Sequence, residues 1–118
     1  MAAFSDRQPA AEPEDLGRLF LDRACAGDVE GVVALYEPEA VLASAAGELS
    51  VGTAAIRRAY EALLASRPQF SGDVRPALRC GDLALTSTRF TGGATAEVAR
   101  RQPDGTWLWI ADQPNVVG

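Results

Sequence analysis

Two carboxylates are the side chains of this 118-residue chain that are best suited to chemistry. Asp112 ends the most apolar and aromatic run, Thr106 to Asp112, and Glu97 lies in the alternating stretch before it, 95–102. A carboxylate in a buried strand must be paired, hydrogen-bonded or neutral, so each is either a structural anchor or part of a site. The chain has no histidine and no lysine, which excludes an imidazole base, a lysine Schiff base and the commonest zinc ligand. Acid–base chemistry therefore falls to Asp, Glu or Tyr, and we expect no metal and no cofactor.

The loop between the two strands decides whether Glu97 and Asp112 share a face, because side chains alternate along a strand. A loop of about two or four residues around Asp104-Gly105 places both on one face, whereas a three-residue loop over 103–105 separates them. Local turn chemistry leaves this open. If both carboxyls enter an apolar interior, repulsion and desolvation raise the pKa of at least one, which yields an acid and a base.

A structural alternative stands beside this hypothesis. Glu97 can pair with an arginine such as Arg89 or Arg101 at a rim, and Asp112 can cap backbone amides near Asn115, because ionised side chains on strands are usually solvated or paired. A third candidate, Tyr60, lies at helical spacing among apolar residues, where an aromatic ring is more often core than catalyst.

Composition and charge exclude several classes of function. The formal charge of −5 argues against a nucleic-acid partner, which would require a basic stripe. No stretch has the apolar length of a membrane span, and the start of the chain lacks the apolar run of a signal peptide, so we expect a cytoplasmic protein with no membrane partner. Cys25 and Cys80 lack metal-ligand spacing and are expected to be buried thiols.

The order of hydrophobic patterns predicts an α+β fold. Residues 1–12 lack periodicity and are expected to form a disordered or loosely attached tail, and residues 13–118 a single domain. Helical spacing predicts three helices: about 14–26, from Asp28 to a stop at Pro38, and from a cap at Thr53 onward. A hairpin over 41–51 separates the last two helices, and alternation predicts strands over 74–80, 83–90, 95–102 and 107–112. The three helices should pack on one face of a strongly curved antiparallel sheet.

Two stretches, AGDVEGVVALY at 26–36 and GTAAIRRAY at 52–60, resemble bacterial ketosteroid isomerases, within the nuclear-transport-factor-like and polyketide-cyclase-like superfamily. Two more, DGTW at 104–107 and ADQP at 111–114, resemble uncharacterised members of that superfamily. The resemblance spans about residues 16–114. It implies a cone-shaped cavity between the sheet and the helices, a hydrophobic small-molecule ligand, and a homodimer through the outer face of the sheet.

The resemblance also assigns positions within that cavity. The oxyanion-hole tyrosine of the isomerases is replaced by Phe20 and their general-base aspartate by Ser44, while their protonated carboxyl aligns with Glu97 and a supporting tyrosine with Tyr60. The family spacing favours a shared face for Glu97 and Asp112. In that register Ile110 lines the cavity with Phe20 and Ser44 as substrate-binding residues. Trp107 and Trp109 then point outward, toward a dimer interface.

These observations lead to one functional hypothesis and two alternatives. We expect an enzyme that uses Asp112, Glu97 and Tyr60 for general acid–base chemistry on an oxygenated apolar substrate, as an isomerase or polyketide-type cyclase. The loss of the family's base and oxyanion tyrosine favours a non-catalytic binding protein instead. An epoxide-hydrolase-like enzyme would require an arginine between the two carboxylates.

Overall fold

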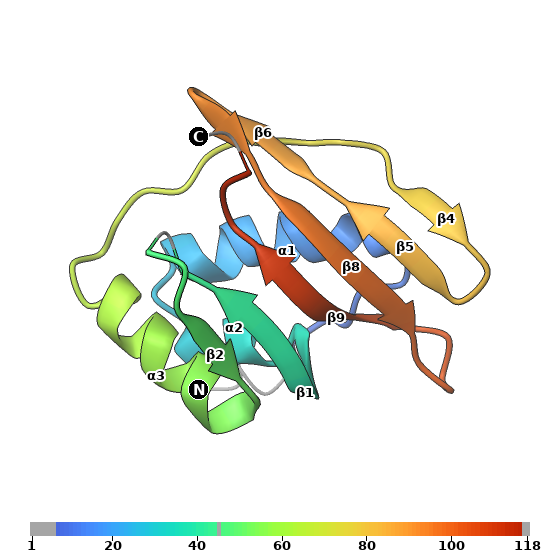
Figure 1. The fold of residues 1–118 in the computed structure, drawn as a ribbon, viewed down its shortest axis with the longest axis horizontal. Helices are drawn as coiled ribbons and strands as arrows, with labels where there is room; N and C mark the ends of the chain where they lie inside the picture. The colour runs from blue at the N-terminus through green and yellow to red at the C-terminus, as the bar shows by residue number, and fades with distance from the viewer. Residues whose placement is uncertain (1–6, 45, 117–118) are drawn as a thin grey trace.

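The structure is a computed structural model that describes residues 7–44 and 46–116. Three helices pack on one face of a sheet, as Figure 1 shows. The helices are α1 (Pro13–Cys25), α2 (Val29–Val33) and α3 (Thr53–Leu64). The strands are β1 (Tyr36–Ala43), β2 (Leu49–Val51), β3 (Asp73–Val74), β4 (Leu78–Cys80), β5 (Leu83–Thr86), β6 (Thr88–Phe90), β7 (Gly93–Ala94), β8 (Ala96–Arg101) and β9 (Trp107–Gln113). The predicted α+β class is confirmed.

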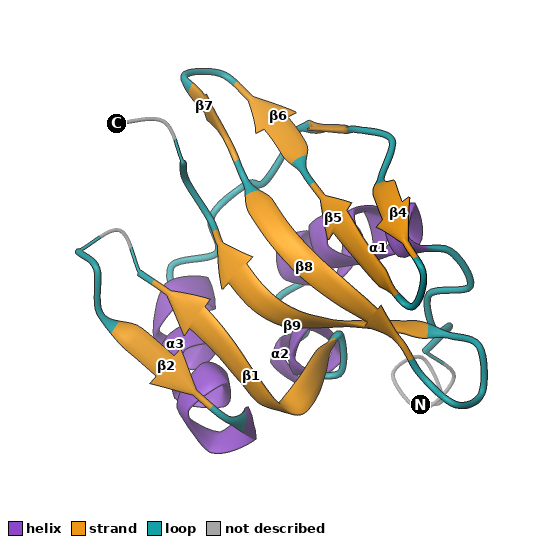
Figure 2. Ribbon diagram, turned by 45° about the vertical axis from the view of Figure 1, so that its right-hand side comes forward, coloured by secondary structure: helices purple, strands orange, loops and turns teal. Residues whose placement is uncertain are grey.

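The main sheet is open and mixed. Its six strands follow the order β2-β1-β9-β8-β5-β4, and a small three-stranded sheet β3-β6-β7 continues it. All neighbours in the main sheet are antiparallel except β1 and β9, which run parallel, so the expected purely antiparallel sheet is wrong at this pair. The described strands do not close into a barrel. Figure 2 shows the three helices on one side of the sheet and the other side uncovered.

Capping side chains mark the starts of α1 and α2. Pro13 opens α1 beneath a reciprocal capping box between Glu12 and Asp15. The Asp28 side chain accepts the Gly31 amide at the start of α2, which ends after only five residues. Their apolar faces form one core with the sheet, in which Leu16, Val32, Leu35 and Ile56 are the largest fully enclosed aliphatic residues. In the described part of the chain, no helix combines the length and apolar character that crossing a membrane requires.

Two predicted element boundaries were wrong. The second helix ends at Val33, before the expected stop at Pro38; Tyr36 begins β1, and Pro38 lies inside that strand. Proline is tolerated there because the pairing between β1 and β9 is irregular from Tyr36 to Val41, so no ladder amide is required from it. Gly52, rather than Thr53, is the N-cap of α3.

A bulge in β9 decides which side chains face the helices. Gln102 and Thr106 bond across the three-residue loop 103–105, in which Gly105 has φ +87°. That loop by itself would put Glu97 and Asp112 on opposite faces. However, Ala99 pairs with Trp109 and Val98 with Ala111, so one extra residue of β9 is accommodated between them. The extra residue shifts the alternation by one, and it turns Asp112 to the same face as Trp109.

Both tryptophans of β9 therefore point inward. Trp107 and Trp109 are buried, and the expectation that they form an outward dimer surface is wrong. Side chains alternate along a strand, so their neighbour Ile110 lies on the other side of the sheet. The prediction that Ile110 lines a cavity on the helix side is therefore wrong.

The expected tail over residues 1–12 lies partly outside the described residues, which begin at Arg7. From there the segment packs against the domain. The Ala10 carbonyl accepts the Trp107 amide at 3.0 Å, and the Gln8 carbonyl accepts the Arg23 guanidinium at 2.5 Å. Arg7 forms a bidentate ion pair with Asp28. Residues 7–10 are thus attached to the domain by backbone pairing with Trp107 and by the buried Arg23.

Candidate active site

A row of four inward side chains crosses the middle of the sheet. Glu97 on β8 lies directly opposite Asp112 on β9, Thr86 on β5 lies opposite Glu97, and Leu42 on β1 lies opposite Asp112. All four are buried, with Glu97 5% and Asp112 8% exposed. The structure therefore brings together the two carboxyls that we expected to share a face.

A chain of hydroxyl groups reaches Asp112 from the helical side. The Tyr36 hydroxyl donates to Asp112 Oδ2 at 2.5 Å, and the Tyr60 hydroxyl lies 2.6 Å from the Tyr36 oxygen. Tyr36 stands at the start of β1 and Tyr60 on the buried face of α3. Tyr60 is thus linked to the carboxyl through a second tyrosine rather than in direct contact with it.

A second chain reaches Glu97 from the sheet. Trp109 Nε1 donates to Thr86 Oγ1 at 3.0 Å, and Thr86 Oγ1 lies 2.6 Å from Glu97 Oε1. An indole N–H is only a donor, so the threonine oxygen accepts from it. The Thr86 hydroxyl donates to Glu97 when that carboxyl is ionised.

The electrostatic environment separates the two carboxyls. Burial, the negative charge of Glu97 and a partly offsetting hydrogen bond from Tyr36 together raise the pKa of Asp112 to about 7. Burial also raises the pKa of Glu97 above its usual value, although hydrogen bonds from Thr86 and Thr95 partly offset this rise. Burial and the nearby carboxylate raise the pKa of both tyrosines, which keeps them neutral donors. The pair is thus suited to hold one proton near neutral pH.

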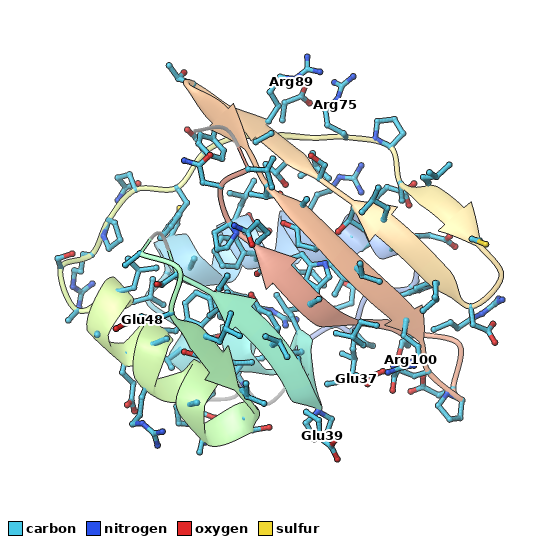
Figure 3. All side chains as sticks on the ribbon, in the orientation of Figure 1. Glu37, Glu39, Glu48, Arg75, Arg89 and Arg100 are labelled. Carbon is cyan, nitrogen blue, oxygen red and sulfur yellow. The ribbon has the colours of Figure 1, made fainter. Side chains whose placement is uncertain are left out.

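The structural alternative for these carboxyls is wrong. Neither Glu97 nor Asp112 forms an ion pair with another described residue. Arg101 pairs instead with Asp82 and lies over the Trp107 ring. Arg89 lies on β6, at the far end of the molecule in Figure 3. Asp112 accepts a side-chain hydroxyl rather than capping amides.

An aromatic cluster encloses the carboxyl pair. The Phe20 ring centroid lies 6.0 Å from that of Tyr60, 5.5 Å from that of Phe70 and 6.2 Å from that of Trp109. Phe20 therefore lies beside the two aromatic residues whose hydrogen-bond chains reach the carboxyl pair. The surroundings of the pair are apolar and aromatic, which is the cause of the desolvation that raises its pKa values.

Two expected substrate-binding residues lie away from the pair. Ser44 is exposed at the hairpin after β1, where its hydroxyl accepts the amides of Ala46 and Glu48. Turn chemistry, rather than ligand contact, thus explains the serine at this position. Ile110 lines an open hollow on the other side of the sheet, together with Glu37, Pro38, Glu39, Ala40 and Arg100. Figure 3 shows the labelled Glu37 beside Arg100, and the two form an ion pair.

Tyr36 is the site residue that sequence reasoning missed. Its spacing from Val29, Val32 and Val33 matches a helical stripe, and this pattern predicts a place in the core of the second helix. The proline two residues later was the available signal, because it limits how far a helix can extend. Among the described residues, no group of three potential metal ligands exists.

Comparison with known proteins identifies the fold and then the family. Among the solved structures similar to this chain, one is described as having a cystatin-like fold and another as NTF-2-like. A SnoaL-like domain profile matches residues 18–113, and the chain belongs to this family of SnoaL-like domains. A search of curated proteins finds no match.

Three solved structures illustrate the similarity. A ketosteroid isomerase-like protein from Erwinia carotovora atroseptica is 16% identical with a TM-score of 0.68, over 84% of this chain and 88% of that one. A candidate dehydratase of the NTF2-like family from Streptomyces avermitilis is 17% identical with a TM-score of 0.69, over 87% and 92%. A candidate calcium/calmodulin-dependent protein kinase type II association domain from Thiobacillus denitrificans is 15% identical with a TM-score of 0.73, over 90% and 95%. At these identities the likeness establishes the fold alone.

Proposed function

We propose that this protein is an acid–base enzyme for an uncharged, oxygenated apolar small molecule, acting as an isomerase or cyclase. Glu97 and Asp112 exchange protons with the substrate. Tyr36 and Tyr60 position Asp112 and remain neutral. The SnoaL-like family and the ketosteroid isomerase-like neighbour support this class of chemistry.

One observation carries the proposal. Two buried carboxyls lie opposite each other on the helix side of the sheet, and neither forms an ion pair with a described residue. Burying an ionised group without a cation is costly, so a structure rarely retains two such groups for stability alone. Pairs of titratable groups with separated pKa values are typical of acid–base sites.

Proton exchange at carbon tests the proposal with simple model ketones in place of the natural substrate. The protein is incubated in D₂O with uncharged cyclic ketones, and loss of the hydrogen on the carbon next to the carbonyl is followed by proton NMR. We expect catalysed exchange for the wild type and a loss of about 100-fold or more for both Asp112→Asn and Glu97→Gln. Asp22→Asn, at an exposed position, is the control and should match the wild type. Exchange that survives both carboxyl substitutions would contradict the proposal.

A non-catalytic binding protein of the same fold is the second candidate. The phenylalanine at position 20 favours it, since this ring packs against Tyr60 and Trp109 without supplying a hydroxyl. Saturable ketone binding without exchange above the buffer rate would support this candidate. The epoxide-hydrolase-like alternative loses its basis, because no arginine of the described residues forms an ion pair with either carboxyl. A homodimeric state and a cytoplasmic location remain part of the proposal.

A further inference from the structure

The loop between α3 and β3 contributes one ring to the aromatic cluster around the carboxyl pair. It runs over residues 65–72, and Figure 1 shows it leaving the end of α3 at the edge of the molecule. The half-buried Phe70 ring packs edge-on against Phe20, with centroids 5.5 Å apart. Phe20 in turn lies against Tyr60 and Trp109. Phe70 is therefore the member of the cluster that a loop, rather than a helix or strand, supplies.

Few contacts hold this loop in place. Gln69 and Ser71 are exposed on either side of Phe70, so the Phe70 ring lies between the cluster and the surface. Among the described residues, the backbone of 68–71 forms hydrogen bonds only with the Cys25 thiol at the end of α1. The Phe70 amide donates to Cys25 Sγ at 3.3 Å, and the thiol donates to the Phe70 carbonyl at 3.2 Å. Both are weak bonds, because sulfur is a weak donor and acceptor. Both cysteines of the chain are exposed, and the expectation that they are buried is wrong.

The backbone of the loop is strained at Arg67. Its φ is +51°, in the left-handed region that residues other than glycine rarely adopt. Pro68 follows it, and a proline restricts the backbone of the residue before it. Such a conformation persists only where surrounding contacts maintain it. Here these contacts are the Phe70 ring and the Cys25 thiol, so the loop is the part of the helical layer that opens most easily.

The carboxyl pair is enclosed while the loop is closed. Glu97 and Asp112 are buried, and neither lines the two open hollows that meet at the ion pair between Glu37 and Arg100. A small molecule can therefore reach the cluster only after part of the surface moves. The Phe70 ring already lies on apolar surface of the kind that a ligand ring would contact.

We propose that Phe70 is a built-in plug: its ring occupies the place over Phe20 that an apolar ligand takes, and the 65–72 loop swings outward when the ligand binds. This inference rests on the proposed function, because it concerns access of that ligand to the same interior. The Cys25 thiol holds the loop closed in the absence of ligand. The measured affinity is then the intrinsic affinity reduced by the fraction of molecules whose loop is open.

Binding of prodan, an uncharged naphthyl ketone whose emission shifts in apolar surroundings, tests the plug. Fluorescence titration gives Kd, and stopped-flow mixing gives the association rate. We expect Phe70→Ala to bind prodan about tenfold more tightly than the wild type, mainly through faster association, because the competing ring is gone. A ring that helps to hold the ligand would give the opposite sign, so equal or weaker binding would overturn the proposal. Gln69→Ala, at an exposed position of the same loop, is the control and should match the wild type.

A second variant separates the plug from a simple hole, because truncation of Phe70 also creates apolar space that can bind prodan. Cys25→Ala leaves the ring in place and removes only the two sulfur contacts. The plug predicts about threefold tighter binding, since more molecules are open, whereas a hole created by truncation predicts no change. Cys80→Ala, at the other exposed cysteine, is the control. Unchanged affinity in Cys25→Ala would overturn the proposal, and this comparison decides it if Phe70→Ala does not fold.

Amide hydrogen exchange followed by mass spectrometry measures opening of the loop without a ligand. In Cys25→Ala we expect residues 66–72 to exchange about tenfold faster than in the wild type, while α3 and β9 keep their protection. Faster exchange throughout the protein would indicate a general loss of stability. That result, or an unchanged loop, would contradict the proposal.

These measurements separate failure of the plug from failure of the proposed function. Prodan binding with the expected changes, but without deuterium exchange into ketones, refutes the enzyme and leaves the plug intact. Ketone exchange that requires the carboxyls, with prodan affinity unchanged in Phe70→Ala and Cys25→Ala, refutes the plug and leaves the enzyme intact. Absence of prodan binding in the wild type and in both variants also overturns the plug.

Discussion

At the scale of residues, the buried carboxyl pair opposes stability. The pKa of Asp112 rises from 3.8 to about 7 on folding because its ionised form is desolvated and faces Glu97. The unfolded chain then releases this proton at lower pH than the native protein does, so native stability falls as pH rises through that window. Retention of such a pair is consistent with the role in proton transfer that we propose.

The pH dependence of unfolding gives the first prediction. Between about pH 5 and pH 7 the native state holds the Asp112 proton and the unfolded state does not, so the free energy of unfolding should decrease by an amount on the order of 2–3 kcal/mol, since one pH unit corresponds to about 1.4 kcal/mol per proton. Asp112→Asn should lose most of this slope and exceed the wild type in stability at pH 8. Urea unfolding at several pH values measures both effects.

The exposed Asp22→Asn provides the reference for that experiment. It should preserve the wild-type slope. An Asp112→Asn variant with the same slope as the wild type would show that the carboxyl ionises normally in the native state.

At the scale of elements, the start of α2 joins three parts of the chain. Asp28 caps this helix through the Gly31 amide and pairs with Arg7 in the segment before α1. The Asp28 side chain is almost enclosed, so its removal would take away the carboxylate that pairs with Arg7 and accepts the Gly31 amide.

Asp28→Ala should therefore destabilise the protein by about 2–4 kcal/mol, since loss of an N-cap alone costs about 0.5–2 kcal/mol and the ion pair is partly buried. The matched control is Glu30→Ala in the same helix, whose ion pair with Arg57 is exposed and should contribute little. Denaturant unfolding of both variants gives the comparison. Equal losses would mean that the contact between Arg7 and Asp28 contributes no more than a surface pair.

The register between β8 and β9 does not follow from the turn residues that join them. Pro103, Asp104 and Gly105 favour the three-residue loop that the structure contains, and this loop alone would separate Glu97 from Asp112. The compensating bulge carries no glycine or proline in Trp109, Ile110 or Ala111. It arises because burial of Trp109 and pairing of β9 with β1 must be satisfied together.

At the scale of the whole molecule, the uncovered face of the sheet carries an apolar row. Paired residues run across all six strands: Leu78, Leu85, Val98, Ala111, Val41 and Val51. The first two and the last are exposed. In a monomer this continuous apolar strip would be exposed to water, and a homodimer would bury it. The strip, rather than the tryptophans, is therefore the reason to predict a homodimer.

Light scattering at micromolar concentration should give the mass of a dimer for the wild type. Leu85→Arg should give a monomer, because a charge in the centre of an apolar interface is left unpaired. Leu63→Arg on α3 is the control, since both leucines are 48% exposed but Leu63 lies on the helical layer. A monomeric wild type, or equal dissociation in both variants, would count against this interface.

Chelation gives the last prediction. The chain has no histidine, and we expect ketone binding and exchange to be unchanged by EDTA, because carboxyls and hydroxyls supply the proposed chemistry. Loss of either property with EDTA, and recovery with added zinc or magnesium, would show that a metal takes part.

The amino-acid sequence by itself determined the α+β class, the three helices and the choice of Glu97, Asp112 and Tyr60 as candidate site residues. Those features depend on local periodicity, caps and residue chemistry, which are written in short stretches of chain. The tertiary structure alone decided that Trp109 faces inward, that Tyr36 begins a strand and reaches Asp112, and that Ser44 and Ile110 lie away from the pair. Each of these depends on strand register, and register is set by contacts between segments far apart in sequence, where a shift of one residue reverses the face of every side chain.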